Sequence, residues 1–270
     1  MKFNRTSVTL LFSMLFVMAT AVFAYDVPKV TQTNPLNPKS AIFIGNSFFY
    51  YNNSLHGHVR DIISAADKKQ PFRGTSVTIS GSGLDWHNVE AYFQPNGIGR
   101  YSFVADNKVQ FNKLDKLFDI AIMMDCSQCP VHPELKALFV EFAKKHSDTV
   151  RKHGAEPVFF MLWAYADAPE MTEQLADAYV KVGNANNAMV IPAGLAFSKS
   201  ITIRPDLILY VPDKRHPSFM GTYLAANVVY ASLFKKSPIG NNYTAGLDPS
   251  VAKHLQTVAW DTVKEFFKIQ

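Results

Sequence analysis

Short apolar runs of strand length alternate with helical patterns along this chain, and this alternation constrains the fold most. Ser40–Gly45 is a continuous apolar run that ends at a glycine, as expected for a strand buried on both faces. Similar or β-like runs occur at 76–80, 118–124, 157–163 and 189–192. Helical spacing occurs at 56–66, 133–153, 171–182, 217–234 and 248–267. The pattern predicts an α/β fold: a three-layer α/β/α sandwich with a parallel, flavodoxin-like central sheet.

The first 24 residues read as a targeting segment. Lys2 and Arg5 form a basic start, residues 8–22 are almost wholly apolar, and Ala24 ends a small-residue cleavage site. This is typical of a secretory signal peptide, and the apolar run is shorter than the roughly 20 residues of a spanning helix. An uncleaved anchor is the alternative. We therefore expect a secreted or periplasmic protein with a single domain at 25–270 and no later membrane span. Its oligomeric state stays open.

The charge pattern argues against a nucleic-acid partner. The formal net charge of +5 falls to +3 without Lys2 and Arg5, and the remaining basic residues are scattered. No arginine-rich stripe with interleaved aromatic residues is present, so nucleic acid is not an expected partner. The segment 99–112 has alternating apolar residues, which predicts a small hairpin beside the functional site.

Two distant segments supply the side chains of a hydrolytic triad. Gly45-Asn46-Ser47 places a serine just after the first predicted strand, and Asp213 precedes His216 by three residues near the C-terminus. A serine hydroxyl needs a histidine base, and that base needs an orienting carboxylate. Ser47, His216 and Asp213 are the candidates for these roles. The alternative for Ser47 is a helix N-cap.

These blocks resemble those of the SGNH (GDSL-like) esterases and lipases. In that family the nucleophile lies in a Gly-Asp/Asn-Ser block, and one late Asp-x-x-His block supplies the other two residues. The resemblance implies a serine esterase that forms an acyl-enzyme and requires no metal or organic cofactor. It also implies three oxyanion donors: the Ser47 amide, a glycine amide after the second strand, and a side chain after the third. Gly81 is favoured for the second donor, with Gly83 as the alternative.

The third donor block departs from the family pattern. The usual Gly-x-Asn-Asp is absent, and Met124-Asp125-Cys126-Ser127-Gln128 stands in its place. Gln128 is the preferred donor because an amide offers two N–H groups, whereas a thiol is a weak donor. The Gly-Asn-Ser-Phe start and this Ser-Gln stretch resemble an uncharacterised exported branch of the family.

Both cysteines, Cys126 and Cys129, lie in this same loop. In an exported protein the pair could form a small disulfide, act as a thiol redox pair, or supply half of a metal site. A zinc site needs about four ligands and the chain has no second cysteine pair, so no metal site is expected. His56 and His58 are expected to be solvated histidines at a helix start.

Three functions remain open from the sequence. The first is an exported esterase that hydrolyses an acyl ester, for example an O-acetyl group on a small molecule or carbohydrate. The second is a catalytically weak or inactive glycan-binding module of the same fold, and the third is a thiol redox protein. Trp163 and Trp86 are the candidate residues of the substrate pocket, with Trp163 equally suited to the core.

Overall fold

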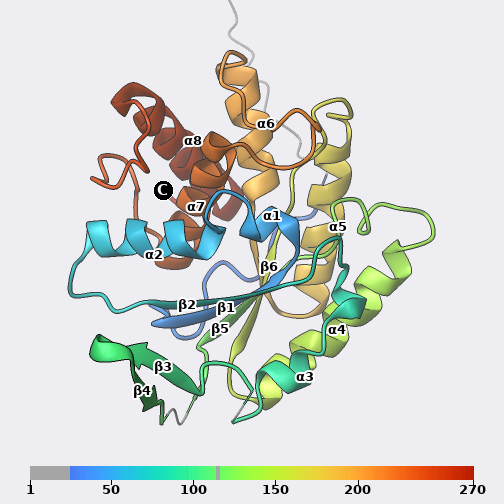
Figure 1. Cartoon of the computed structure of the whole chain (residues 1–270). Coiled ribbons are helices and arrows are strands. Elements are labelled where there is room, and N and C mark those ends of the chain that lie inside the picture. The colour runs from blue at the N-terminus through green and yellow to red at the C-terminus, as the bar shows by residue number, and fades with distance from the viewer. Residues whose placement is uncertain (1–24, 96, 114–115) are drawn as a thin grey trace, which may run out of the picture.

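The computed structural model describes residues 25–95, 97–113 and 116–270, and it centres on one parallel sheet (Figure 1). Its five strands lie in the order β2-β1-β5-β6-β7, and every neighbouring pair is parallel. The strands are β1 (Ser40–Gly45), β2 (Arg73–Thr78), β5 (Ile120–Met123), β6 (Glu156–Phe160) and β7 (Met189–Ile191). The chain therefore has the predicted α/β fold.

Burial of the strands follows their apolar composition. All four residues of β5, the central strand, are buried, and so is β1 beyond Ser40. The edge strand β2 is half-buried throughout and contains more polar residues. Continuous apolar runs were therefore reliable indicators of the inner strands, because an inner strand of a covered parallel sheet contacts helices on both faces.

Helices cover both faces of the sheet and complete the three layers (Figure 1). One layer contains α2 (Leu55–Ala66), α7 (Phe219–Phe234) and α8 (Pro249–Phe267), and α7 packs against both of the others. The other contains α3 (Val89–Tyr92), α4 (Lys136–Lys152) and α5 (Met171–Ala185). A further helix, α6 (Ala193–Ile203), packs against α5, α7 and α8 and was not predicted.

The two C-terminal helices begin and pack as their sequences indicate. Every residue of α7 from Gly221 onward is buried, as expected for a helix that is apolar on all sides. Helix α8 begins at Pro249, and the side chain of Asp248 accepts hydrogen bonds from the Ser250 and Val251 amides. This confirms the predicted Asp-Pro helix start.

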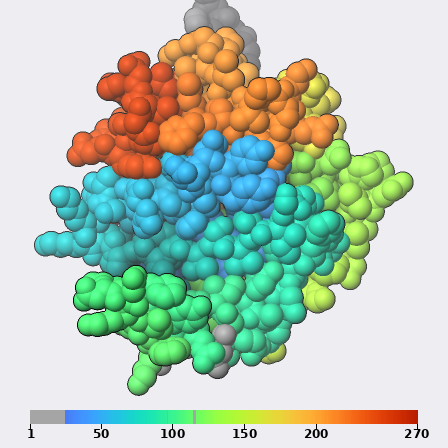
Figure 2. All heavy atoms as spheres, viewed as in Figure 1, coloured from blue at the N-terminus to red at the C-terminus, as the bar shows by residue number. Residues whose placement is uncertain are grey.

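The predicted hairpin exists, but it does not lie beside the functional site. Strands β3 (Tyr101–Val104) and β4 (Lys108–Phe111) are antiparallel and flank a short 3-10 turn, Ala105–Asn107. The hairpin comes directly before β5 in the sequence. Because β5 runs parallel to β1, the chain must first return to the edge of the sheet at which both strands begin. Arg73, the first residue of β2, lies next to Gly99 at the hairpin base. The hairpin is accordingly remote from the short helix α1 (Ser47–Tyr50), which follows β1, in Figures 1 and 2.

The predicted signal peptide, residues 1–24, lies outside the described residues. In the part of the chain that is described, none of the helices combines the length and the apolar character needed to cross a membrane.

Candidate active site

The nucleophile candidate lies where β1 passes directly into a helix. Helix α1 (Ser47–Tyr50) is a single turn, and Asn46 is its N-cap, with Oδ1 accepting from the Phe48 amide at 3.2 Å. The Asn46 Nδ2 group donates to the Ser82 carbonyl at 2.8 Å and to the Asp125 carbonyl at 3.2 Å. Asn46 thus joins the loops that follow β1, β2 and β5. No local sequence pattern predicts this role of Asn46, because its partners lie 36 and 79 residues away.

The side chains of Ser47, His216 and Asp213 form a chain of two hydrogen bonds. Ser47 Oγ is 2.7 Å from His216 Nε2, and His216 Nδ1 is 2.5 Å from Asp213 Oδ2. With Nδ1 donating to the carboxylate, Nε2 presents its lone pair to the serine hydroxyl. Ser47 is buried. This is the arrangement that a serine nucleophile, its base and an orienting carboxylate require.

The Asp213 carboxylate is stabilised in its ionised form. Burial acts to raise its pKa, but hydrogen bonds from the His216 ring and from the Arg215 and His216 amides outweigh it, so the net pKa is lowered. Both amides donate to Oδ1 at 2.9 Å, which leaves Oδ2 for the imidazole. Asp213 therefore stays negative where it faces His216.

Two aromatic rings hold the His216 imidazole in place. The Tyr51 ring stacks on it at 4.4 Å between centroids and an angle of 8°, and the Phe48 ring lies at 4.8 Å. Both residues come from the segment that begins with Ser47. Neither had a predicted role, although the aromatic residues directly after Gly-Asn-Ser were visible in the sequence.

A hollow of about 380 Å³ opens over Ser47 and His216. Its walls come from the segments after β1, β2, β5 and β6, represented by Tyr50, Gly81, Gln128 and Tyr165. In Figure 2 the blue surface of the segment after β1 meets the orange surface of the C-terminal third of the chain. The predicted convergence of strand ends at the carboxyl edge is therefore present.

The two glycines after β2 have different positions. Gly81 lines the hollow and has a φ of +74°, in a turn closed by the Ser82 amide and the Ile79 carbonyl. This positive φ favours glycine. A Cβ on Gly83 would lie 2.7 Å from Asp125 Oδ1, so Gly83 allows close packing of the two loops instead. Of the two oxyanion candidates, Gly81 is the one that faces the hollow.

The loop after β5 is closed by a disulfide between Cys126 and Cys129, whose Cα atoms are 5.2 Å apart. Ser127 Oγ lies 2.6 Å from the Tyr165 hydroxyl, and Gln128 is exposed at the hollow. Asp125 and the two sulfur atoms cluster within 4.8 Å, but sulfurs bonded to each other are not thiolate ligands. The loop therefore does not offer the donor set of a metal site in this state.

Two buried ionisable side chains lie beneath the site. Burial raises the pKa of Asp125 to about 6, although amide hydrogen bonds from Cys126 and Leu84 act to lower it. Burial lowers the pKa of His87 to about 4. His87 Nε2 is 3.1 Å from the Gly45 carbonyl, so this ring supports the end of β1.

The two tryptophans predicted for the pocket do not line this hollow. Trp163 is buried and stacks on Phe197 at 3.9 Å, and its Nε1 donates to the Arg215 carbonyl at 2.9 Å. Trp163 therefore lies in the core, which was the alternative to the pocket, and supports the segment before His216. Trp86 lies in the 3-10 turn Leu84–Trp86 and is 60% exposed.

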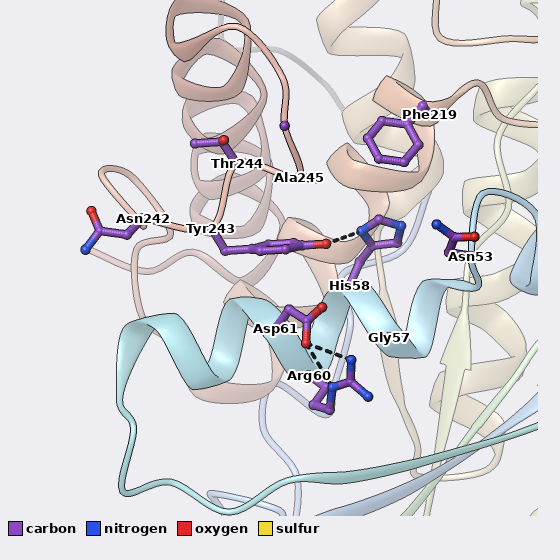
Figure 3. Close-up of a pocket in the computed structure, with 11 residues that line it drawn as sticks. Asn53, Gly57, His58, Arg60, Asp61, Phe219, Asn242, Tyr243, Thr244 and Ala245 are labelled. Atoms are coloured by element: carbon purple, nitrogen blue, oxygen red, sulfur yellow. Dashed lines mark hydrogen bonds and ion pairs between the residues drawn. The ribbon is translucent and has the colours of Figure 1, made fainter.

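A second hollow, of about 500 Å³, lies between α2, the start of α7 and the segment 242–246 (Figure 3). Here the Tyr243 hydroxyl is 2.8 Å from His58 Nδ1, and His58 Nε2 donates to the Asn52 carbonyl at 2.7 Å. His58 is thus buried and paired, which corrects the expectation of a solvated histidine. The side-chain Nδ2 group of Asn52 in turn donates to the Pro217 carbonyl at 3.0 Å. The second hollow is therefore linked to the residue after His216.

Comparisons with known proteins identify the fold. No family profile matches the chain, and no curated protein matches it. A DUF4886 family protein from Bacteroides uniformis has 18% identity and a TM-score of 0.57, covering 83% of this chain and 94% of that one. A protein from Slackia heliotrinireducens, provisionally described as an SGNH hydrolase, has 17% identity and a TM-score of 0.53, covering 73% and 100%.

An acetylxylan esterase from Geobacillus stearothermophilus is similar at 13% identity and a TM-score of 0.52, covering 75% of this chain and 95% of that one. These identities are low, so the comparisons bear on architecture. The chain has an SGNH-like α/β/α fold, with Ser47, His216 and Asp213 at the carboxyl edge of its parallel sheet.

Proposed function

We propose that this protein is an exported serine esterase that uses Ser47, His216 and Asp213. The observation that carries the proposal is the pair of contacts at His216: 2.7 Å to the serine hydroxyl and 2.5 Å to the carboxylate. The hollow above Ser47 gives an ester access to the hydroxyl. Export rests on the sequence pattern of residues 1–24.

In the proposed reaction, Ser47 Oγ attacks the ester carbonyl carbon while His216 Nε2 accepts the hydroxyl proton. Collapse of the tetrahedral intermediate breaks the bond to the alcohol oxygen, and His216 returns the proton to that oxygen. Water then attacks the acyl-enzyme with His216 again as the base, and the acid leaves Ser47. Asp213 stays ionised throughout and stabilises the imidazolium, in line with its lowered pKa.

The oxyanion would be stabilised by the Ser47 and Gly81 amides and by Gln128. All three residues line the hollow. Other groups of the loop after β5 are already engaged: the Cys126 amide donates to Asp125, and the Ser127 hydroxyl pairs with Tyr165. The Gln128 side chain has no intramolecular partner among the described residues, which favours it as the third donor.

An acyl ester of a small molecule or carbohydrate is the proposed substrate class. One structural neighbour is an acetylxylan esterase, and two of its solved catalytic mutants replace a serine and a histidine with alanine. The same two residue types form the 2.7 Å contact here. No cofactor takes part in the proposed steps.

The test is covalent labelling with a fluorophosphonate probe, combined with hydrolysis of nitrophenyl esters of graded acyl length. The parent should label at Ser47 and hydrolyse short esters. Ser47→Ala should lose labelling and more than about 1,000-fold in kcat. Ser64→Ala, which removes an exposed serine from α2, is the matched control and should behave as the parent. Undiminished hydrolysis by a folded Ser47→Ala protein would refute the triad.

The same experiment distinguishes the proposed esterase from the alternative of a glycan-binding module. The departure of the loop after β5 from the family pattern favours that alternative, because losing one oxyanion donor costs about 2.7–4 kcal/mol. A binding module with a decayed site would bind glycans, yet would neither label nor turn over any ester. Thiol quantification under mild reduction tests the redox alternative at Cys126 and Cys129.

A further inference from the structure

An arginine with no carboxylate partner lines the active-site hollow. Arg215 lies in the wall beside Ser47 and His216, and no Asp or Glu is among the described residues that line this hollow. Its guanidinium carbon stands 4.7 Å from the centroid of the Tyr165 ring. The hollow therefore holds a cation whose hydrogen-bond donors are free to bind a ligand.

Arg215 is held in position from three sides. Its amide donates to Asp213 Oδ1 and its carbonyl accepts from Trp163 Nε1, both at 2.9 Å. The Tyr165 ring beneath the guanidinium is itself fixed by the 2.6 Å contact between its hydroxyl and Ser127. Stacking on an aromatic face fixes the guanidinium plane and reduces the entropy lost when a ligand binds.

Several other basic residues, including the neighbour of Arg215 in sequence, are paired with carboxylates within the chain. The neighbouring Lys214 lies 3.5 Å from Asp167, and ion pairs also form within the pairs Arg60–Asp61, Arg151–Glu156 and Arg204–Asp206. Asp213 is close in sequence to Arg215, but both of its oxygens accept hydrogen bonds from the His216 ring and two amides. The positive charge of Arg215 is therefore available in the hollow.

We propose that the preferred substrate is an acyl ester of an alcohol that carries a carboxylate, such as an acylated uronic acid, and that Arg215 binds this carboxylate. The inference rests on the proposed function. A planar guanidinium matches a carboxylate through two parallel hydrogen bonds. His216 protonates the leaving alcohol, so the alcohol lies on the side of the hollow to which Arg215, the preceding residue, belongs.

The test uses two substrates that differ in one group: O-acetylglucuronate and O-acetylglucose, with acetate release as the readout. The parent should hydrolyse the uronate with a kcat/KM about tenfold higher or more, and added salt should reduce this ratio. Arg215→Gln should bring the ratio close to one. Lys214→Gln removes a charge from the adjacent position outside the hollow and should keep the preference.

Equal kcat/KM for the two substrates in the parent, or an unchanged preference in Arg215→Gln, would overturn the inference while the esterase proposal stands. If neither substrate is hydrolysed, labelling of Ser47 by the fluorophosphonate decides whether the esterase proposal holds. Calorimetric titration with glucuronate then decides the role of Arg215. Binding by the parent that is lost in Arg215→Gln supports the inference, and absence of binding refutes it.

Discussion

At the scale of single residues, each of the three proposed triad residues is held by contacts beyond the two hydrogen bonds between their side chains. Asn46 fixes the backbone before Ser47, Tyr51 stacks on His216, and two amides hold Asp213. Such supports keep the reacting groups in position before an ester binds, which is what proximity and orientation effects require.

The sequence indicated the three residues proposed as a triad, which the structure brings together, but not the residues that hold them. A serine after a strand and an Asp-x-x-His block carry local patterns that indicate chemistry. Asn46 and Tyr51 act through partners distant in sequence; Asp125, for example, lies 79 positions after Asn46. No local pattern encodes such contacts.

Gln128 gives the first prediction at this scale. Gln128→Ala should lower kcat by about 10²–10³-fold with little change in KM, because an oxyanion donor acts mainly on transition-state charge. Gln110→Ala, on the remote strand β4, is the control and should leave both constants unchanged. Steady-state kinetics on a nitrophenyl ester measure the difference.

The cysteine variants provide the contrasting outcome. Cys126→Ser with Cys129→Ser opens the small ring and should cost about 2 kcal/mol of unfolding free energy, with a smaller effect on kcat. If this double variant loses kcat and Gln128→Ala does not, the third oxyanion donor is Ser127 instead, because the disulfide-bonded sulfur of Cys126 carries no hydrogen.

At the scale of elements, the strands and long helices followed from hydrophobic periodicity, and the misses have physical reasons. Helix α6 contains Gly194 near its start and ends in Ile201-Thr202-Ile203, so its sequence has low helix propensity and tertiary packing decides its structure. The hairpin was identified correctly but placed at the wrong edge. Its location depends on the direction in which β5 runs, which the local pattern does not contain.

The connection between α1 and α2 gives the element-scale prediction. Asn52, Asn53 and Ser54 all have positive φ, of 53°, 66° and 69°. The side-chain Nδ2 group of Asn52 donates to the Pro217 carbonyl at 3.0 Å and to Thr222 Oγ1 at 2.8 Å. These hydrogen bonds connect this segment to the residues after His216. Asn52→Ala should cost about 3–4 kcal/mol, from two hydrogen bonds of about 1 kcal/mol each and a left-handed backbone that alanine disfavours by about 1–2 kcal/mol.

Asn52→Gly separates these two contributions. It loses the same hydrogen bonds but tolerates the positive φ, so chemical denaturation should find it about 1 kcal/mol more stable than Asn52→Ala. Both variants should lower kcat, because the tether next to His216 is gone. Parent-like kcat in both would show that the triad does not depend on this connection.

At the scale of the whole molecule, two buried groups should change the unfolding free energy with pH in opposite directions. Asp125 has a folded pKa of about 6 against an ordinary value of 3.8, so the folded state binds more protons between these values and stability falls as pH rises. His87 has a folded pKa of about 4 against 6.5, so the unfolded state binds more protons there and stability rises with pH. The two effects largely cancel between about pH 4 and 6.

Substituting either Asp125 or His87 should reveal the pH dependence of the unfolding free energy that the other residue causes. In Asp125→Asn the unfolding free energy, relative to the parent, should increase by up to about 3 kcal/mol from pH 4 to 6, since one pKa unit corresponds to about 1.4 kcal/mol. In His87→Gln the difference from the parent should change by a similar amount in the opposite direction. Urea unfolding at several pH values measures both slopes. Parallel curves for the parent and both variants would mean that neither group titrates differently in the folded and unfolded protein. Changes of opposite sign in the two variants would show that Asp125 and His87 both do.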